Sequence, residues 1–227
     1  SDTEVVLYGL HQWGPERAVP RFDGMFAFAY FDLRSRTLWL SRDRSGIKPL
    51  YTARAGSTLA FASEMKAFFA HPAIPCRPDL HALTTMVIHQ RLDGKWTPFE
   101  NVQCVVPGTL LKVTRDGEEE IVYFDPLRDL DVDRIVNARS IPFEVLLAEF
   151  EELFAKSVQM HLISDAPLAA MLSGGLDSSL MLAVAHRQKR DIVGYVADLK
   201  GSRLSEVPRA RTVADHLGVE LRPVAVD

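Results

Sequence analysis

The sequence contains only two cysteines among its 227 residues, and they lie far apart, at Cys76 and Cys104. A small fold held together by disulfides needs a dense set of cysteines, so this class of protein is excluded. Neither cysteine lies in an electropositive turn or at a helix N-terminus, where a reactive thiolate is favoured. We therefore expect two free thiols that serve packing in a cytoplasmic protein.

Long apolar runs and an excess of charge of one sign are also missing. No apolar stretch approaches the length needed to cross a bilayer, and no signal peptide is present, so we expect no membrane partner. The 30 acidic and 26 basic residues interleave and leave a net charge of −4, which argues against a nucleic-acid partner. A chain of 227 residues, 47% of them hydrophobic, suffices for one large or two small soluble domains.

What the sequence does contain is a glycine- and hydroxyl-rich segment, Ser-Gly-Gly-Leu-Asp-Ser-Ser, at residues 173–179. An apolar run of strand length precedes it at residues 167–172, and a helical pattern follows at residues 179–189. Glycines let the backbone approach phosphate oxygens, and the start of a helix offers unpaired N–H groups and a positive dipole end. The pattern predicts an anion site in which both glycines leave room for the ligand and the serines add hydroxyl donors.

The same segment lacks the lysine of the phosphate loop found in ordinary kinases and ATPases, and it carries Asp177 instead. Because a carboxylate repels a phosphate, Asp177 makes sense as a ligand of a Mg²⁺ ion that bridges to the phosphate oxygens. The segment resembles the pyrophosphate loop of ATP pyrophosphatases, which split ATP into AMP and pyrophosphate and adenylate a substrate. The structural alternative is a serine-rich helix cap.

Up to residue 124 the patterns mainly predict strands and hairpins. We expect a first helix, for which Asp2 is a candidate cap, a short helix before Pro72, and a helix that begins at Pro78-Asp79 with Leu80, Leu83, Met86 and Val87 on one face. Strands are expected at residues 24–32, 37–43, 58–63, 109–114 and 121–124, the last two joined by a turn at Asp116-Gly117.

After residue 124 the pattern changes to alternating helices and strands. Residues 125–139 are polar and aperiodic and indicate a linker, so we place the domains at residues 1–126 and 127–227. Expected helices span residues 143–162, 179–189 and 206–217, and expected strands span residues 167–172, 192–199 and 220–226. This alternation predicts a parallel sheet, which binds ligands at the carboxyl ends of its strands, so Ala197 and Asp198 are candidates for an adenosine pocket.

Seven segments, in order and spacing, are similar to the glutamine-hydrolysing asparagine synthetase (asparagine synthetase B-like) family. They are Ser1–Val5, Gly24–Ala29, Arg42–Tyr51, Phe61–Ala67, Val106–Gly108, Ser173–Ser179 and Ala214–Gly218. The resemblance implies the N-terminal-nucleophile (class II glutamine amidotransferase) fold over residues 1–126. It implies a parallel-sheet ATP pyrophosphatase (adenine-nucleotide α-hydrolase-like) domain over residues 127–227. Both domains are expected to be partial.

The activity that the resemblance implies is a ligase reaction with ATP and Mg²⁺ as cofactors. ATP adenylates the side-chain carboxylate of aspartate and releases pyrophosphate, and ammonia from glutamine then displaces AMP. The expected partners are these small molecules, with a homodimer left open and a cytoplasmic location. Matched by position, the ATP-binding residues are Leu172, Ser173, Gly174, Gly175, Asp177, Ser178 and Ala197, and Asp177 is also the metal ligand.

In the first domain, Asp2 matches the aspartate that holds the α-amino group of glutamine, with the helix cap as its alternative role. Family motifs also include Arg42, Asp43 and Lys48, where a structural interpretation is an Arg42–Asp43 ion pair beside a turn at Gly46. The motif Ser63, Glu64 and Lys66 has a similar structural alternative.

The departures from the family pattern concern its catalytic parts. The family's N-terminal cysteine, its glutamine-binding Asn-Gly-Glu segment, its second nucleotide motif and its catalytic lysine do not occur here. We therefore expect an internal fragment with no catalytic residue of its own and no activity alone. Two alternatives stay open: a β-lactam synthetase-like or peptide-amidating ligase of the same superfamily, and a non-catalytic nucleotide-binding remnant.

Overall fold

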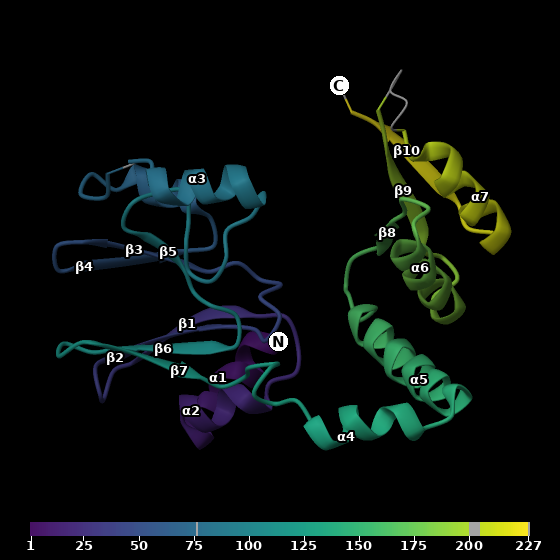
Figure 1. The fold of residues 1–227 in the computed structure, drawn as a ribbon. Helices are drawn as coiled ribbons and strands as arrows, with labels where there is room; N and C mark the ends of the chain where they lie inside the picture. The colour runs from purple at the N-terminus through teal and green to yellow at the C-terminus, as the bar shows by residue number, and fades with distance from the viewer. Residues whose placement is uncertain (76, 200–204, 227) are drawn as a thin grey trace. The chain divides into compact units, whose positions relative to one another are not determined.

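The computed structural model describes residues 1–75, 77–199 and 205–226 (Figure 1). The chain divides into two compact units, Ser1–Leu130 and Asp131–Asp227. The boundary placed from the sequence, between residues 126 and 127, falls inside a turn at residues 126–129. Cys76 lies outside the described residues.

The first unit contains two antiparallel sheets. The larger has the order β1-β2-β6-β7, and the smaller has the order β4-β3-β5. Asp32 sets the first hairpin turn, because its side chain accepts hydrogen bonds from Arg34 N at 2.9 Å and Ser35 Oγ at 2.8 Å. The strands are β1 (Ala27–Asp32), β2 (Thr37–Arg42), β3 (Tyr51–Ala55), β4 (Thr58–Ala62), β5 (Val102–Cys104), β6 (Thr109–Val113) and β7 (Glu118–Val122).

The larger sheet is buried on both faces. Trp39 and Leu110 pack with the first helices, whereas their neighbours Leu40 and Leu111 belong to a second cluster with Leu50 on the opposite face. Because successive residues of a strand point to opposite faces, a strand covered on both sides reads as a continuous apolar run. The edge strand β7 differs, since it begins with three exposed glutamates.

The helices of the first unit are α1 (Asp2–Trp13), α2 (Pro15–Ala18), η1 (Val19–Arg21), η2 (Met65–Ala70) and α3 (Leu80–His89). The predicted cap by Asp2 is wrong, because Ser1 is the N-cap residue of α1 and Asp2 is its first helical residue. Helix α3 begins where it was expected, with the side chain of Asp79 accepting from Ala82 N at 3.0 Å.

The apolar residues predicted to share one face of α3 are largely exposed. Leu80 and Val87 are 74% and 78% exposed, and the only buried residue of the helix is Ala82. The spacing of apolar residues identified the helix correctly, but Ala82 is the residue that is buried, and Leu83 is only half-buried.

The second unit contains a parallel sheet with the order β10-β9-β8, as predicted from the alternation of elements (Figure 1). Its core joins Leu182, Val196, Ala210 and Ala214, and Val158 of the long helix α5 packs against the same cluster. The elements are α4 (Val132–Asn137), η3 (Ala138–Ser140), α5 (Phe143–His161), β8 (Ala169–Met171), α6 (Leu176–Gln188), β9 (Val193–Asp198), α7 (Val207–Leu217) and β10 (Leu221–Ala225).

Two boundaries differ from the sequence-based expectation. The segment predicted as an irregular linker contains helix α4, which begins because the side chain of Asp131 accepts from Arg134 N at 2.9 Å. Helix α6 begins at Leu176 with Gly175 as its N-cap, so Asp177 lies in its first turn. None of the helices in the described part of the chain is long and apolar enough to cross a membrane.

Gly108 and Gly56 offer a matched test of the first unit. Both have left-handed φ angles, +70° and +59°, but a Cβ on Gly108 would lie 2.3 Å from the carbonyl oxygen of Phe124, whereas Gly56 faces open space. We expect Gly56→Ala to lower the free energy of unfolding by about 1–2 kcal/mol, and Gly108→Ala to lower it further. Urea unfolding followed by tryptophan fluorescence measures this, because all three tryptophans lie in the first unit. Equal losses would show that the strand end moves aside without cost.

Candidate functional site

The glycine- and serine-rich loop of the second unit starts from a fixed point at the end of β8. Leu172 is 1% exposed, and its backbone N–H donates to the carbonyl oxygen of Tyr195 in β9 at 2.7 Å. Since Met171 pairs with Tyr195 in a parallel register, the loop leaves the sheet beside Ala197, near the carboxyl end of β9. The sequence-predicted residues Leu172, Ser173 and Ala197 therefore lie at one edge of the sheet.

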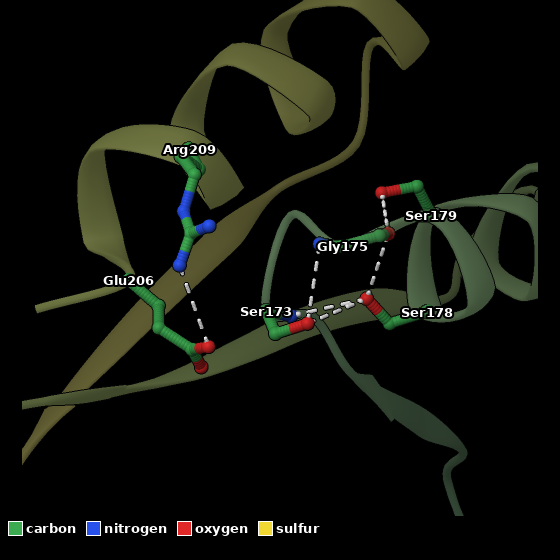
Figure 2. A network of polar contacts seen from close by, with 6 residues as sticks. All are labelled: Ser173, Gly175, Ser178, Ser179, Glu206 and Arg209. Atoms are coloured by element: carbon green, nitrogen blue, oxygen red, sulfur yellow. Dashed lines mark hydrogen bonds and ion pairs between the residues drawn. The ribbon is translucent and has the colours of Figure 1, made fainter. Parts of the chain in front are cut away.

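The hydroxyl groups of the loop bond to one another and to its backbone (Figure 2). Ser173 Oγ lies 2.9 Å from Ser178 Oγ and accepts from Gly175 N at 3.2 Å, while Ser179 Oγ donates to the carbonyl oxygen of Gly175 at 2.6 Å. The three serines predicted to add hydroxyl donors therefore also hold the shape of the loop.

The start of α6 supplies backbone N–H donors in addition to the serine hydroxyl groups. Ser179 N donates to Gly175 O at 3.1 Å, so the N–H groups of Leu176, Asp177 and Ser178 precede the first bond inside the helix. Such groups, together with the positive end of the helix dipole, favour an anion. The geometry can therefore hold a phosphate at the N-terminus of α6.

The two glycines of the loop are required for different reasons. Gly174 has φ +72°, and a Cβ there would lie 2.6 Å from the carbonyl carbon of Arg209 and 2.7 Å from Ala210 N, both in the backbone of α7. Gly175 is extended, with φ −77°, and a Cβ there would meet only Ser173 Oγ, at 3.2 Å. The close packing of α7 therefore requires Gly174, whereas a Cβ on Gly175 would press only on the hydroxyl group of Ser173.

Asp177 is the candidate metal ligand of this loop. Its side chain is exposed in the first turn of α6, and within the described ranges no cluster of three His, Cys, Asp or Glu residues forms a ready metal cage. Mg²⁺ commonly uses one or two carboxylates and completes its shell with water and phosphate oxygens. A single exposed carboxylate beside a phosphate site fits that mode of binding.

The first unit contains an open pocket of about 690 Å³. Its wall combines Asp2 from the start of α1, the segment at residues 21–28, Lys48 with Pro49, and Ser63. The motif residues Glu64 and Lys66 form an exposed ion pair at 2.6 Å instead. Residues from four separate sequence motifs thus meet at one pocket, and both an acidic and a basic side chain line it.

Asp43 holds one side of the loop that carries Lys48. Asp43 is 1% exposed, and its carboxylate accepts hydrogen bonds from the backbone N–H groups of Ser45 at 3.1 Å, Ile47 at 2.9 Å and Lys48 at 2.9 Å. Burial alone would raise the pKa of Asp43, but the donors that surround the carboxylate lower it, and the net pKa lies below the usual value.

Arg42 holds the opposite side of the same loop. Its guanidinium donates to the carbonyl oxygens of Gly46 at 2.7 Å, Lys48 at 2.8 Å and Val105 at 3.0 Å. The ion pair expected between Arg42 and Asp43 is not formed, because consecutive residues at the end of a strand point in opposite directions. The turn expected at Gly46 is present, with φ +67°.

The thiol of Cys104 lies beside this arginine. Its Sγ is 2.8 Å from Arg42 Nη1, yet burial raises the pKa of the Cys104 thiol, and the nearby guanidinium only partly opposes that effect. A protonated, half-buried thiol is a poor nucleophile.

Comparison with known proteins follows the division into two units. Residues 1–124 match the family described as glutamine amidotransferase domain, and residues 149–227 match the family described as asparagine synthase. Asparagine synthetase [glutamine-hydrolyzing] 3 of Bacillus subtilis (strain 168) is 34% identical over 189 residues, which are 82% of this chain and 29% of that relative. The asparagine synthetase [glutamine-hydrolyzing] of Homo sapiens is 28% identical over 234 residues, covering 96% of this chain and 38% of the relative.

A solved structure of glutamine phosphoribosylpyrophosphate amidotransferase from B. subtilis covers 98% of the chain at 15% identity, with a TM-score of 0.38. The match covers 39% of that structure's chain.

More than half of the chain matches the amidotransferase domain, which defines the class of its first unit. The asparagine synthase match follows it in the sequence, and the chain belongs to the family of glutamine-hydrolysing asparagine synthetases. The chain spans about a third of the length of the curated relatives that it matches.

The buried carboxylate of Asp43 provides a test of how the pocket wall is held. Because its folded-state pKa lies below the ordinary value of 3.8, its contribution to stability is present above about pH 4 and is lost as the pH falls through the folded-state pKa. We expect Asp43→Asn to lower the free energy of unfolding by about 2–3 kcal/mol near neutral pH, and by less near pH 3. Urea unfolding followed by tryptophan fluorescence at both pH values measures the difference.

The exposed turn residue Asp116 is the control for this experiment, and Asp116→Asn should change stability little at either pH. A loss for Asp43→Asn that is equal at both pH values would contradict the role assigned to the ionised carboxylate.

Proposed function

We propose that this chain takes part in glutamine-dependent asparagine synthesis, in which an aspartate side chain is adenylated by ATP and ammonia from glutamine displaces AMP. The observation that carries the proposal is the loop at residues 172–178, whose free helical N–H groups and exposed Asp177 are joined in one chain to a glutamine amidotransferase unit. We assign residues 1–126 to the C-terminal part of the glutaminase domain. Residues 127–227 form the start of the synthetase domain, with the fold of an ATP pyrophosphatase.

In the synthetase unit, the loop binds the pyrophosphate part of ATP. The backbone at Gly174 and Gly175 and the N–H groups at the start of α6 face the phosphate oxygens, while Ser173 and Ser178 hold the loop in shape. Leu172 and Ala197 flank the nucleotide at the edge of the sheet. Asp177 holds Mg²⁺, which offsets the charge between the carboxylate and the phosphates.

The chemistry explains why a nucleotide is needed. A carboxylate is a poor electrophile, and transfer of AMP to it creates a good leaving group that a nitrogen nucleophile can displace. The residues of the loop favour this step by binding pyrophosphate as its charge develops, since preorganised N–H donors cost no reorganisation at that moment.

In the glutaminase unit, the pocket bordered by Asp2 and Lys48 receives glutamine. The carboxylate of Asp2 has the charge needed to bind the α-amino group. The hydrogen bonds of Arg42 and Asp43 fix the loop that carries Lys48 on another part of the wall. We place the enzyme in the cytoplasm, as the family resemblance implies, and a homodimer is compatible with the proposal.

Nucleotide binding is the direct test of the synthetase assignment. Gly175→Val and Asp177→Asn should each weaken the binding of Mg-ATP by roughly one to two decades, because the first obstructs the helix start and the second removes a charged ligand. Gly175 suits this test better than Gly174, since a side chain at Gly174 would collide with α7 whether or not a ligand is present. Isothermal titration calorimetry, with and without EDTA, measures the affinity.

Asp165→Asn is the matched control, because this exposed aspartate precedes β8, at the amino end of the same strand. If Gly175→Val and Asp177→Asn bind Mg-ATP like the wild type, or if EDTA changes nothing, the loop is only a helix cap and the proposal fails.

The glutaminase assignment has its own test in the complete enzyme. Asp2→Asn should raise KM for glutamine roughly 10- to 100-fold, because the contact with the α-amino group loses its charge. Synthesis supported by added ammonia should be unchanged, since it bypasses the glutamine pocket. An equal loss with both nitrogen sources would place the effect of Asp2 outside glutamine binding.

A further inference from the structure

The phosphate loop lacks a lysine, but the structure places an arginine directly against it. The backbone and the Cβ of Arg209 lie 2.6 and 2.7 Å from the position that a Cβ on Gly174 would occupy. Arg209 lies in the first turn of α7, and its side chain extends beside the loop toward Glu206 (Figure 2). Its backbone cannot move away from the loop easily, because the next residue, Ala210, is fully buried in the core.

The position of Arg209 does not stabilise its own helix. Cations stabilise the C-terminal turn of a helix and are disfavoured near the N-terminus, where the dipole is positive. The nearby Glu206 compensates only weakly, since Arg209 Nη2 lies 3.7 Å from Glu206 Oε1 and the two side chains are 68% and 45% exposed. An exposed pair with this geometry contributes little to stability, so the guanidinium is free to exchange its partner.

We propose that Arg209 binds the β- and γ-phosphates of the nucleotide held by the loop, and that it exchanges the carboxylate of Glu206 for phosphate oxygens when it does so. This inference rests on the proposed function of the loop and names the cation that complements Asp177 and Mg²⁺ there. A guanidinium suits the role, because its planar set of donors binds two phosphate oxygens at once. Glu206 then acts as a competitor that holds Arg209 in the absence of ligand.

The experiment titrates the protein with Mg-ATP, with Mg-pyrophosphate and with AMP. Arg209→Ala should weaken the binding of Mg-ATP and Mg-pyrophosphate roughly 10- to 100-fold and leave AMP binding unchanged, since AMP lacks the β- and γ-phosphates. Arg209→Lys should restore part of the affinity, because it keeps the charge without the paired donors. Arg211→Ala, an exposed arginine on the same helix, is the control and should bind all three ligands like the wild type.

Glu206 provides a readout that a purely structural role of Arg209 would not move. Glu206→Gln should tighten the binding of Mg-pyrophosphate several-fold in the wild-type background and change nothing in the Arg209→Ala background. If the effect of Glu206→Gln is the same in both backgrounds, the exchange between the two partners is refuted.

The outcomes separate this inference from the proposal on which it rests. If Gly175→Val weakens Mg-ATP binding and Arg209→Ala does not, the loop binds nucleotide and the role of Arg209 is overturned. If neither variant changes the affinity, the proposed nucleotide site itself fails. Loss of AMP binding in Arg209→Ala would show a general disturbance of the site and would also overturn the inference.

Discussion

The second unit depends on the close approach between Gly174 and the backbone of α7. With φ +72° and no room for a Cβ, this glycine lets the loop after β8 pack directly on the first turn of a helix that follows the next strand. The contact joins the elements that follow β8 and β9 at the same edge of the sheet. The loop consequently has its shape before any ligand arrives, and binding does not need to order it.

In the first unit, a loop is also held in a fixed shape, but by hydrogen bonds to charged side chains and not by close packing of the backbone. The loop after β2 exposes backbone N–H groups on one side and carbonyl oxygens on the other, and both sets must find partners when they are buried. Asp43 accepts from the N–H groups and Arg42 donates to the carbonyl oxygens, so adjacent residues of opposite charge stabilise one loop without touching each other. Lys48 reaches the wall of the pocket as a result.

The sequence predicted the elements better than their contacts. The hairpin at Asp116-Gly117, the parallel sheet and the helix start at Asp79 were each predicted from a local signal. The helix start at Asp131 has a similar local signal, but it was missed because the segment around it is polar throughout. Local signals cannot tell which residue of α3 becomes buried, since that depends on packing against residues that are distant in the sequence.

The candidate site shows the same limit. The residues of the loop were identified from their pattern, but the start of α6 was placed three residues too late, because glycine followed by Leu-Asp-Ser-Ser resembles a turn as much as a first helical turn. Arg209 was not singled out at all. Only the fold brings residue 209 against residue 174, and no spacing along the chain encodes that proximity.

The exposed glutamates of β7 have a consequence for how the protein behaves at high concentration. An edge strand offers a row of unpaired backbone groups that can extend into a neighbouring molecule and start aggregation. The exposed side chains Glu118–Glu120 line this edge, and two of them are paired, Glu118 with Arg54 and Glu119 with Lys112. A second copy of the edge would have to remove water from these charged groups, so the charged edge opposes self-association of the larger sheet.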